Sequence, residues 1–152
     1  MAQDSDQTRV ATEAAIAGDW RALTESIRRI PLHALMGLTV VEGGPHTVVT
    51  MELTDAVRGA ADGSVHGGML ATLADFASAI SIRGSLESTE IPATTDLHLR
   101  YYRQPRGGPL TAVVDVVHHG RRLIGTECVI TDSKQRVLAR SAATYMVVAV
   151  AE

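Results

Sequence analysis

A run of small and apolar residues near the middle of the chain has the spacing of a helix. Between positions 64 and 81, apolar side chains recur every three or four residues: Met69, Leu70, Leu73, Ala77 and Ile80. This spacing puts them on one helical face. Asp75 falls on the opposite side, beside the small residues Gly68 and Ala71. The pattern predicts a helix ending near Gly84, with its apolar side on the core and a second surface packed closely against its carboxylate side.

Two strand-like runs precede this helix and four follow it. They span residues 38–42, 46–53, 92–103, 110–119, 122–132 and 137–150. The breaks between consecutive runs are short, so hairpins and an antiparallel sheet are expected. In the run 92–103, Leu97, Leu99 and Tyr101 alternate with polar residues, as in a strand with one buried face. The long apolar helix is the cover available for that face, so we predict an α+β fold with a curved antiparallel sheet wrapped around one central helix.

The beginning of the chain is predicted to be helical. Helical spacing is found over residues 9–16 and 20–30. Gly18 separates the two pieces, and Asp19 can cap the second one. Residues 1–7 are polar and expected to be frayed. These helices are expected to cover an edge of the core.

Length and composition indicate a single globular domain. The chain has 152 residues, is 45% apolar and 20% charged, and has a net charge of −3 at pH 7, the balance of an ordinary soluble protein. We divide it into an N-terminal helical extension, 1–34, and a main domain, 35–152. The chain has no basic run or apolar stretch of membrane length, so neither nucleic acid nor a membrane is expected as partner. The acidic N-terminus lacks the features of a secretion signal, so a cytoplasmic location is expected.

Residues suited to metal or thiol chemistry are sparse. The single cysteine, Cys128, excludes an internal disulfide, and its apolar surroundings are typical of a small buried hydrophobe. His118 and His119 are adjacent, so in a strand they face opposite sides, and no carboxylate accompanies them at ligand spacing. No metal site is expected.

The start of the central helix has the features of a site for a developing negative charge. Gly67 and Gly68 occupy the first helical positions, where backbone N–H groups lack intrahelical acceptors. Without side chains, these residues let another group approach the donors. The partial positive charge of a helix N-terminus adds to this, so a carbonyl oxygen becoming negative can be held there.

Three motifs together resemble those of the hotdog-fold acyl-CoA thioesterases, specifically the subfamily named for phenylacetate degradation. They are VHGGMLATLAD at residues 65–75, PATTDLHLRYYRQP at 92–105 and HGRR at 119–122. The His-Gly-Gly sequence alone is a weak signal, and the Leu-Ala-Asp sequence and the following strand make it specific. The resemblance covers roughly residues 35–148.

The resemblance implies a role for each motif residue. The backbone N–H of Gly67 polarises the thioester carbonyl, and Asp75 attacks it as a nucleophile or activates water as a general base. His66 is implied to position the loop or the substrate. Thr94 matches a position where a hydroxyl assists in some relatives, but strand alternation puts it on the polar side with Asp96, so reaching the site requires a β-bulge. No cofactor is implied beyond the coenzyme A of the substrate.

The spacing of the two reactive groups has a further consequence. Asp75 follows Gly67 by eight residues, which is about 12 Å along a helix at 1.5 Å per residue. A base must lie within hydrogen-bonding reach of the reacting centre. We therefore expect two helices to pack antiparallel, with each Asp75 serving the partner's Gly67. The resemblance likewise implies a homodimer with shared sites, which often pairs into a homotetramer.

A basic pair lies in the turn between two predicted strands. Arg121 and Arg122 follow Gly120, and the resemblance implies that this hairpin and Gly68 contact the substrate, with the arginines on the phosphates of coenzyme A. The alternative is an exposed basic turn with no ligand.

Two positions depart from the family pattern, and two other functions stay open. Ala60 stands where many relatives have asparagine, and the bulky Phe76 follows Asp75, where it could narrow an acyl tunnel. A hotdog hydratase or dehydratase and a non-catalytic acyl-CoA-binding module are the alternatives to a thioesterase.

Overall fold

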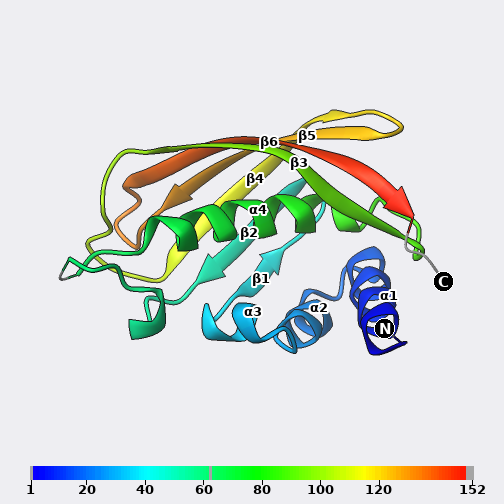
Figure 1. Ribbon diagram of the computed structural model, residues 1–152, viewed down its shortest axis with the longest axis horizontal. Coiled ribbons are helices and arrows are strands. Elements are labelled where there is room, and N and C mark those ends of the chain that lie inside the picture. The colour runs from blue at the N-terminus through cyan, green and yellow to red at the C-terminus, as the bar shows by residue number, and fades with distance from the viewer. Residues whose placement is uncertain (1, 62, 150–152) are drawn as a thin grey trace.

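The computed structural model describes residues 2–61 and 63–149, with side chains from residue 9 onward. A six-stranded antiparallel sheet curves around one long helix, α4 (Gly67–Arg83), as Figure 1 shows. The strands are β1 (Thr39–Glu42), β2 (His46–Met51), β3 (Glu90–Tyr101), β4 (Leu110–His119), β5 (Leu123–Thr131) and β6 (Val137–Ala149). The predicted α+β fold is therefore confirmed.

Helix α4 forms where the apolar spacing predicts it. Its buried residues include Leu70, Leu73, Ala77 and Ile80, which pack against the inner face of the sheet. A fully buried aliphatic side chain contributes roughly 1.5–3 kcal/mol, so this face holds the helix in the curve of the sheet. The helix ends at Arg83, with Gly84 as its C-cap.

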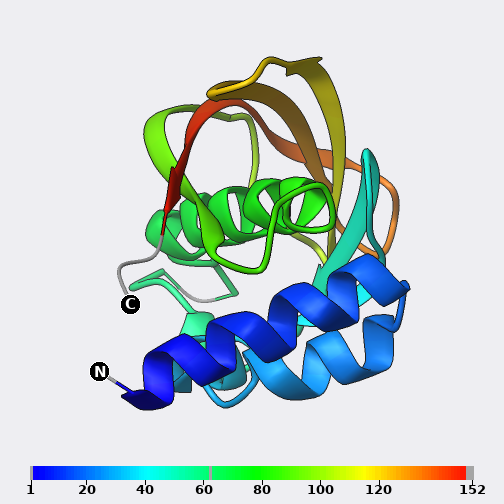
Figure 2. The ribbon, with the colours of Figure 1, turned by 90° about the vertical axis from the view of Figure 1, so that its right-hand side faces the viewer.

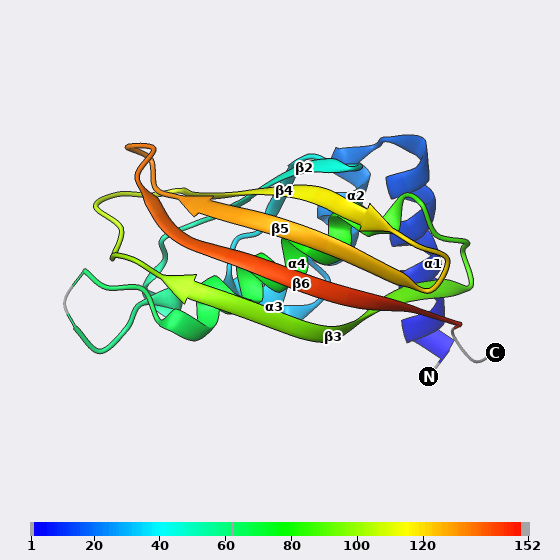
Figure 3. The same cartoon turned by 90° about the horizontal axis from the view of Figure 1, so that it is seen from above.

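The strand order differs from a series of hairpins. It is β1-β2-β4-β5-β6-β3, so β3 pairs with β6 and not with its successor β4. The expectation of hairpins between all consecutive strands was wrong at this point. The connection between β3 and β4 spans residues 102–109, which is long for a hairpin and crosses the sheet to the far side of β5. Figure 3 shows β4, β5, β6 and β3 side by side over α4.

Three helices close the open side of the curved sheet (Figure 2): α1 (Ala2–Ala17), α2 (Trp20–Ile27) and α3 (Pro31–Leu35). Gly18 separates the first two with a φ of 69°, and the Asp19 carboxylate accepts a hydrogen bond from Ala22 N–H at 2.9 Å. Helix α1 begins at Ala2, although residues 1–7 were expected to be frayed. Helix α2 ends at Ile27, three residues before the predicted end at residue 30, because Pro31 begins a separate helix, α3.

The N-terminal helices contact the sheet at defined points. A side chain at Gly43, in the β1–β2 turn, would lie 2.5 Å from the Trp20 ring, so glycine is required for this close approach.

Among the described helices, none has the length and apolar character needed to cross a membrane.

Candidate active site

The side chain of Asp75, on α4, is held by two hydroxyl groups from the sheet. Thr94 Oγ1, on β3, donates to Asp75 Oδ1 at 2.8 Å. Tyr145 Oη, on β6, donates to the same oxygen at 2.9 Å and lies equally close to the Asp75 backbone carbonyl. No hydrogen bond within the described part of the chain reaches Oδ2. Oδ1 of the carboxylate therefore accepts two hydrogen bonds, and Oδ2 is available to accept a proton or to attack a substrate.

Thr94 reaches Asp75 because β3 contains a bulge. Thr94 pairs with Tyr145 and Asp96 pairs with Thr144, so Thr95 is an extra residue between them. The Thr95 hydroxyl donates to the Thr144 carbonyl at 2.9 Å. The extra residue turns Thr94 to the same side of the sheet as Leu97. This is the bulge that the alternation pattern required.

Tyr145 was missed by the sequence analysis. Its side chain is fully buried between β6 and α4, and burial raises the pKa of its hydroxyl, as do the charge and the hydrogen bond of Asp75. Tyr145 is therefore a neutral donor at physiological pH. In the sequence it follows the alternation of inward-facing β6 residues, so it is indistinguishable from an ordinary core aromatic.

The N-terminus of α4 presents one free donor. His66 is the N-cap, and its Nδ1 accepts a hydrogen bond from Gly68 N–H at 3.0 Å. Because Nδ1 accepts this hydrogen bond, the ring N–H that remains available is on Nε2. Within the described residues no hydrogen bond uses the Gly67 N–H. Of the two predicted glycine donors, one is thus capped by His66 and the other is available.

Two residues at the end of β3 and beyond it support this helix start. The Tyr101 hydroxyl donates to the Gly67 carbonyl at 3.0 Å. Gln104 Oε1 accepts a hydrogen bond from Val65 N–H at 2.9 Å, two residues before Gly67. The β3–β4 connection thus fixes the orientation of the loop that presents the Gly67 donor.

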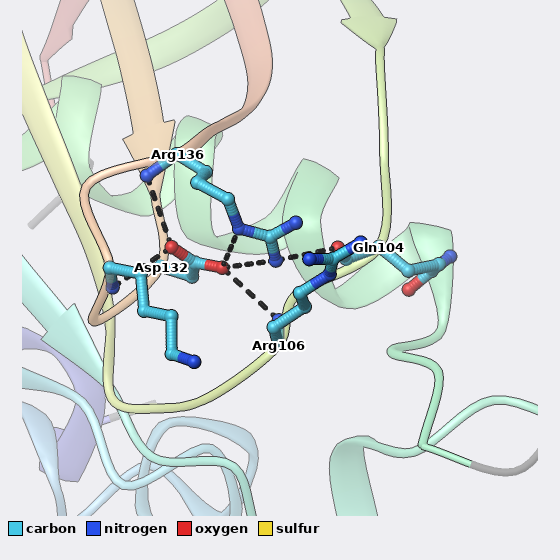
Figure 4. A network of polar contacts seen from close by, with 5 residues as sticks. Gln104, Arg106, Asp132 and Arg136 are labelled. Atoms are coloured by element: carbon cyan, nitrogen blue, oxygen red, sulfur yellow. Dashed lines mark hydrogen bonds and ion pairs between the residues drawn. The ribbon is translucent and has the colours of Figure 1, made fainter.

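That connection is itself anchored by a buried carboxylate (Figure 4). Asp132 accepts hydrogen bonds from the backbone N–H groups of Arg106, Lys134 and Arg136 at 3.0–3.1 Å, and from the Arg136 guanidinium. Arg136 also donates to the Gln104 carbonyl at 3.4 Å. Burial favours a higher pKa for Asp132, but the three backbone donors and the guanidinium outweigh it and hold the pKa well below its usual range.

The basic hairpin lies at the other end of the central helix. Gly120 N–H donates to Leu123 O at 2.9 Å and closes the β4–β5 turn, and Arg121 and Arg122 are exposed. The neighbouring His119 Nε2 lies 3.3 Å from Ser85 Oγ, just beyond the C-terminus of α4. The 17 residues of α4 span about 24 Å. The β4–β5 hairpin and Gly67 of the same chain therefore lie at opposite ends of α4.

The remaining predicted features have the following places. Ala60 lies in an exposed turn, in which Gly59 N–H donates to Ser64 O at 3.1 Å. Phe76 is buried against α3, with its ring centroid 4.7 Å from that of His33. Cys128 is a free, buried thiol. No group of three or more metal-binding side chains is found among the described residues.

Comparison with known proteins assigns a family. The profile of the thioesterase superfamily matches residues 62–139. The chain is 30% identical over 100 residues to 1,4-dihydroxy-2-naphthoyl-CoA hydrolase of Listeria monocytogenes, an alignment covering 66% of this chain and 80% of the relative.

Solved structures share the fold. A thioesterase from Haemophilus influenzae is similar with a TM-score of 0.79 at 19% identity, over 88% of this chain and 92% of the other. A Streptococcus mutans protein bound to acetyl-CoA is similar with a TM-score of 0.65 at 22% identity, over 76% and 91% of the two chains. On the profile match, the related hydrolase and the fold, this chain belongs to the thioesterase superfamily, as a thioester hydrolase of the hotdog fold.

Proposed function

We propose that the protein hydrolyses an acyl-CoA thioester to the free acid and coenzyme A. The observation that carries this proposal is a pair of groups on α4, the Gly67 N–H and Asp75 Oδ2, that make no hydrogen bond to the residues the structure describes. The Listeria relative is named as a CoA-ester hydrolase, and the Streptococcus mutans structure contains acetyl-CoA. Both support the choice of a coenzyme A ester over other thioesters.

The Gly67 N–H suits the thioester carbonyl. The donor lies at the N-terminus of a helix, where the helix dipole adds partial positive charge. Negative charge develops on the carbonyl oxygen during attack, so the donor stabilises the transition state more than the bound substrate. The neighbouring Gly68 N–H already donates to His66 Nδ1, so it does not compete for the carbonyl oxygen. The His66 side chain is exposed, and its Nε2–H stays available.

Asp75 acts through Oδ2, by one of two routes. As a general base it takes a proton from water, whose oxygen attacks the carbonyl carbon while the carbon–sulfur bond breaks. The coenzyme A thiolate then takes up a proton, and the free acid is released. As a nucleophile, Oδ2 itself forms the new bond to the carbonyl carbon as the carbon–sulfur bond breaks and the thiolate leaves, and water then hydrolyses the resulting anhydride. Either route uses the oxygen that Thr94 and Tyr145 leave open.

The two reactive groups belong to different subunits in this proposal. Asp75 is about 12 Å along the helix from its own Gly67. Strand β3 is at the edge of the sheet, and its last residue, Tyr101, and the following Tyr102 are 53% and 51% exposed. Unpaired edges of this kind favour association. A homodimer with antiparallel α4 helices brings each Asp75 to the partner's Gly67, and each Arg121–Arg122 hairpin toward the partner's helix start.

The primary test is thiol release from a panel of acyl-CoA esters by wild type and Asp75→Asn. We expect the substitution to lower hydrolysis at least ~100-fold with an unchanged fold. Asp96→Asn, an exposed residue on β3, is the matched control and should keep wild-type activity. Retention of turnover by Asp75→Asn would remove this residue from the mechanism, and hydration of crotonyl-CoA without thiol release would indicate a hydratase.

The shared site can be tested by complementation. Gly67→Pro replaces the N–H donor with a ring carbon, and the helix should be kept because proline suits the first helical position and His66 already has an extended ψ of 127°. Each variant alone should be inactive. Mixed dimers of Gly67→Pro and Asp75→Asn contain one intact site, so co-expression should restore part of the activity. No recovery in verified mixed dimers would place both groups in one subunit.

A further inference from the structure

A cavity of about 370 Å³ separates the N-terminal helices from α4 and the start of β3. Its lining is apolar except for Ser26, His33 and Arg83. Helices α1 and α2, which form one wall, run beneath α4 in Figure 2. The cavity is within the size range of ligand pockets, which are mostly apolar with few polar groups.

The cavity lies along α4 next to Asp75, because its lining includes Phe76, the residue that follows. Ala79 lines it and follows Asp75 by four residues, so both lie on one face of α4. Pro92, also in the lining, precedes Thr94 by two residues, and Thr94 is bonded to Asp75. Residues on both α4 and β3 thus place the cavity beside Asp75, in reach of a group that extends along α4 from a carbonyl at this residue.

We propose that this cavity binds the acyl group, with helices α1 to α3 as its outer wall, and that it selects a compact apolar acyl group of up to about twelve non-hydrogen atoms. The inference rests on the proposed acyl-CoA hydrolysis. At roughly 30 Å³ for a water-sized group, 370 Å³ holds about twelve non-hydrogen atoms. Benzoyl has about eight such atoms and fits, while palmitoyl has about seventeen and does not.

The aromatic part of the cavity wall, Phe76 and His33, matches such a group chemically. The rings of Phe76 and His33 meet edge to face at an interplanar angle of 61°, and they form an aromatic part of the wall. Burial lowers the pKa of His33, which the Ile27 carbonyl opposes in part, so the imidazole is neutral at pH 7. An apolar acyl group thus meets an uncharged surface at this wall.

The test is the ratio of kcat/KM for benzoyl-CoA, acetyl-CoA and palmitoyl-CoA. Wild type should prefer benzoyl-CoA to both others, by at least ~10-fold over acetyl-CoA. Ala79→Leu, on α4, and Ala11→Leu, on α1, fill the cavity from opposite walls and should each lower the benzoyl-to-acetyl ratio at least ~10-fold. Ala142→Leu, exposed on the outer face of β6, is the matched control and should leave the ratio unchanged.

The outcomes separate this inference from the proposed function. If Ala79→Leu does not fold, Ala11→Leu carries the test from the other wall. Unchanged ratios in the folded variants, or a preference of wild type for palmitoyl-CoA, would overturn the acyl site while Asp75→Asn still abolishes hydrolysis. Wild-type activity in Asp75→Asn would instead overturn the proposed function.

A second observation concerns Tyr145. Its hydroxyl donates to both the side chain and the backbone carbonyl of Asp75, and the tyrosine is fully buried. We infer that Tyr145 is a positioning residue that holds Asp75 with Oδ2 directed away from the sheet. A hydrogen bond to a charged group is among the stronger ones, so its loss should allow the carboxylate to rotate.

Tyr145→Phe removes the hydroxyl and keeps the ring. We expect kcat to fall about 10-fold with KM nearly unchanged. Thr95→Val is the control, because it removes a hydroxyl that binds the Thr144 carbonyl and not Asp75. In an Asp75→Asn background, Tyr145→Phe should have no further effect on the residual rate. An equal loss in both backgrounds would show that Tyr145 acts only through general stability and would overturn the inference.

Discussion

Thr94 and Asp75 are joined by a 2.8 Å hydrogen bond that exists only because β3 contains one extra residue, Thr95. A regular strand would turn the Thr94 hydroxyl to the outer face of the sheet. The bulge therefore couples the backbone of an edge strand to the orientation of the carboxylate on α4. Bulges commonly redirect a side chain in this way beside functional sites.

Thr94→Val should lower kcat about 10-fold, because Asp75 Oδ1 then loses one of its two donors. The measurement is steady-state thiol release from a good acyl-CoA substrate. Thr95→Val is the matched control one residue away, since its hydroxyl binds the Thr144 carbonyl and not Asp75. Equal effects of the two substitutions would show that strand geometry matters here and the Thr94 hydroxyl does not.

Asp132→Asn should destabilise the protein at neutral pH. The folded pKa of Asp132 is held below its unfolded value of about 3.9, so its contribution is present above that value and is lost as the pH falls toward the folded pKa. At pH 7 we expect the melting temperature to fall by at least ~5 °C. The difference from wild type should shrink as the pH falls from about 5 to 2.

Asp115→Asn is the control for that experiment, because Asp115 is exposed in its pair with His46. Thermal unfolding of the three proteins across this pH range provides the measurement. A difference between wild type and Asp132→Asn that stays constant with pH would contradict a stabilising ionised carboxylate.

Replacement of Arg121 and Arg122 by alanine should raise KM for acyl-CoA esters about 10-fold and spare a thioester without the nucleotide. The reason is that the pair is exposed in the β4–β5 turn and is proposed to contact the coenzyme A phosphates. An N-acetylcysteamine thioester with the same acyl group serves as the short substrate. Replacement of the exposed Arg21 and Arg29 is the matched control. Equal losses on both substrates would assign the pair a structural role.

Cys128 should be unreactive in the folded protein. Burial raises the pKa of its thiol to about 12, although Ser141 opposes this in part, so the thiolate is scarce at pH 8. Ellman's reagent should modify the native protein very slowly and the urea-unfolded protein within minutes. Rapid modification of the native protein, with no loss of structure, would contradict the buried position.

Several elements could be predicted from local pattern alone. The spacing of Leu70, Leu73, Ala77 and Ile80 predicted α4 because a helix needs one apolar face to pack on a sheet. The alternation from Leu97 to Tyr101 likewise predicted a strand, and the position of Thr94 in it predicted that a bulge was needed. Signals of this kind depend on a few neighbouring residues, so they are visible without tertiary contacts.

Other features depend on residues far apart in the chain. The pairing of β3 with β6, the two bonds from Tyr145 to Asp75 and the bond from Val65 to Gln104 join residues separated by 38 positions or more. The cavity between the N-terminal helices and α4 has the same origin. The sequence by itself determined the elements, the family motifs and the identity of Asp75 and Gly67 as candidates. Only the tertiary structure decided which oxygen of Asp75 is open, because that depends on hydroxyl groups brought to it by two different strands.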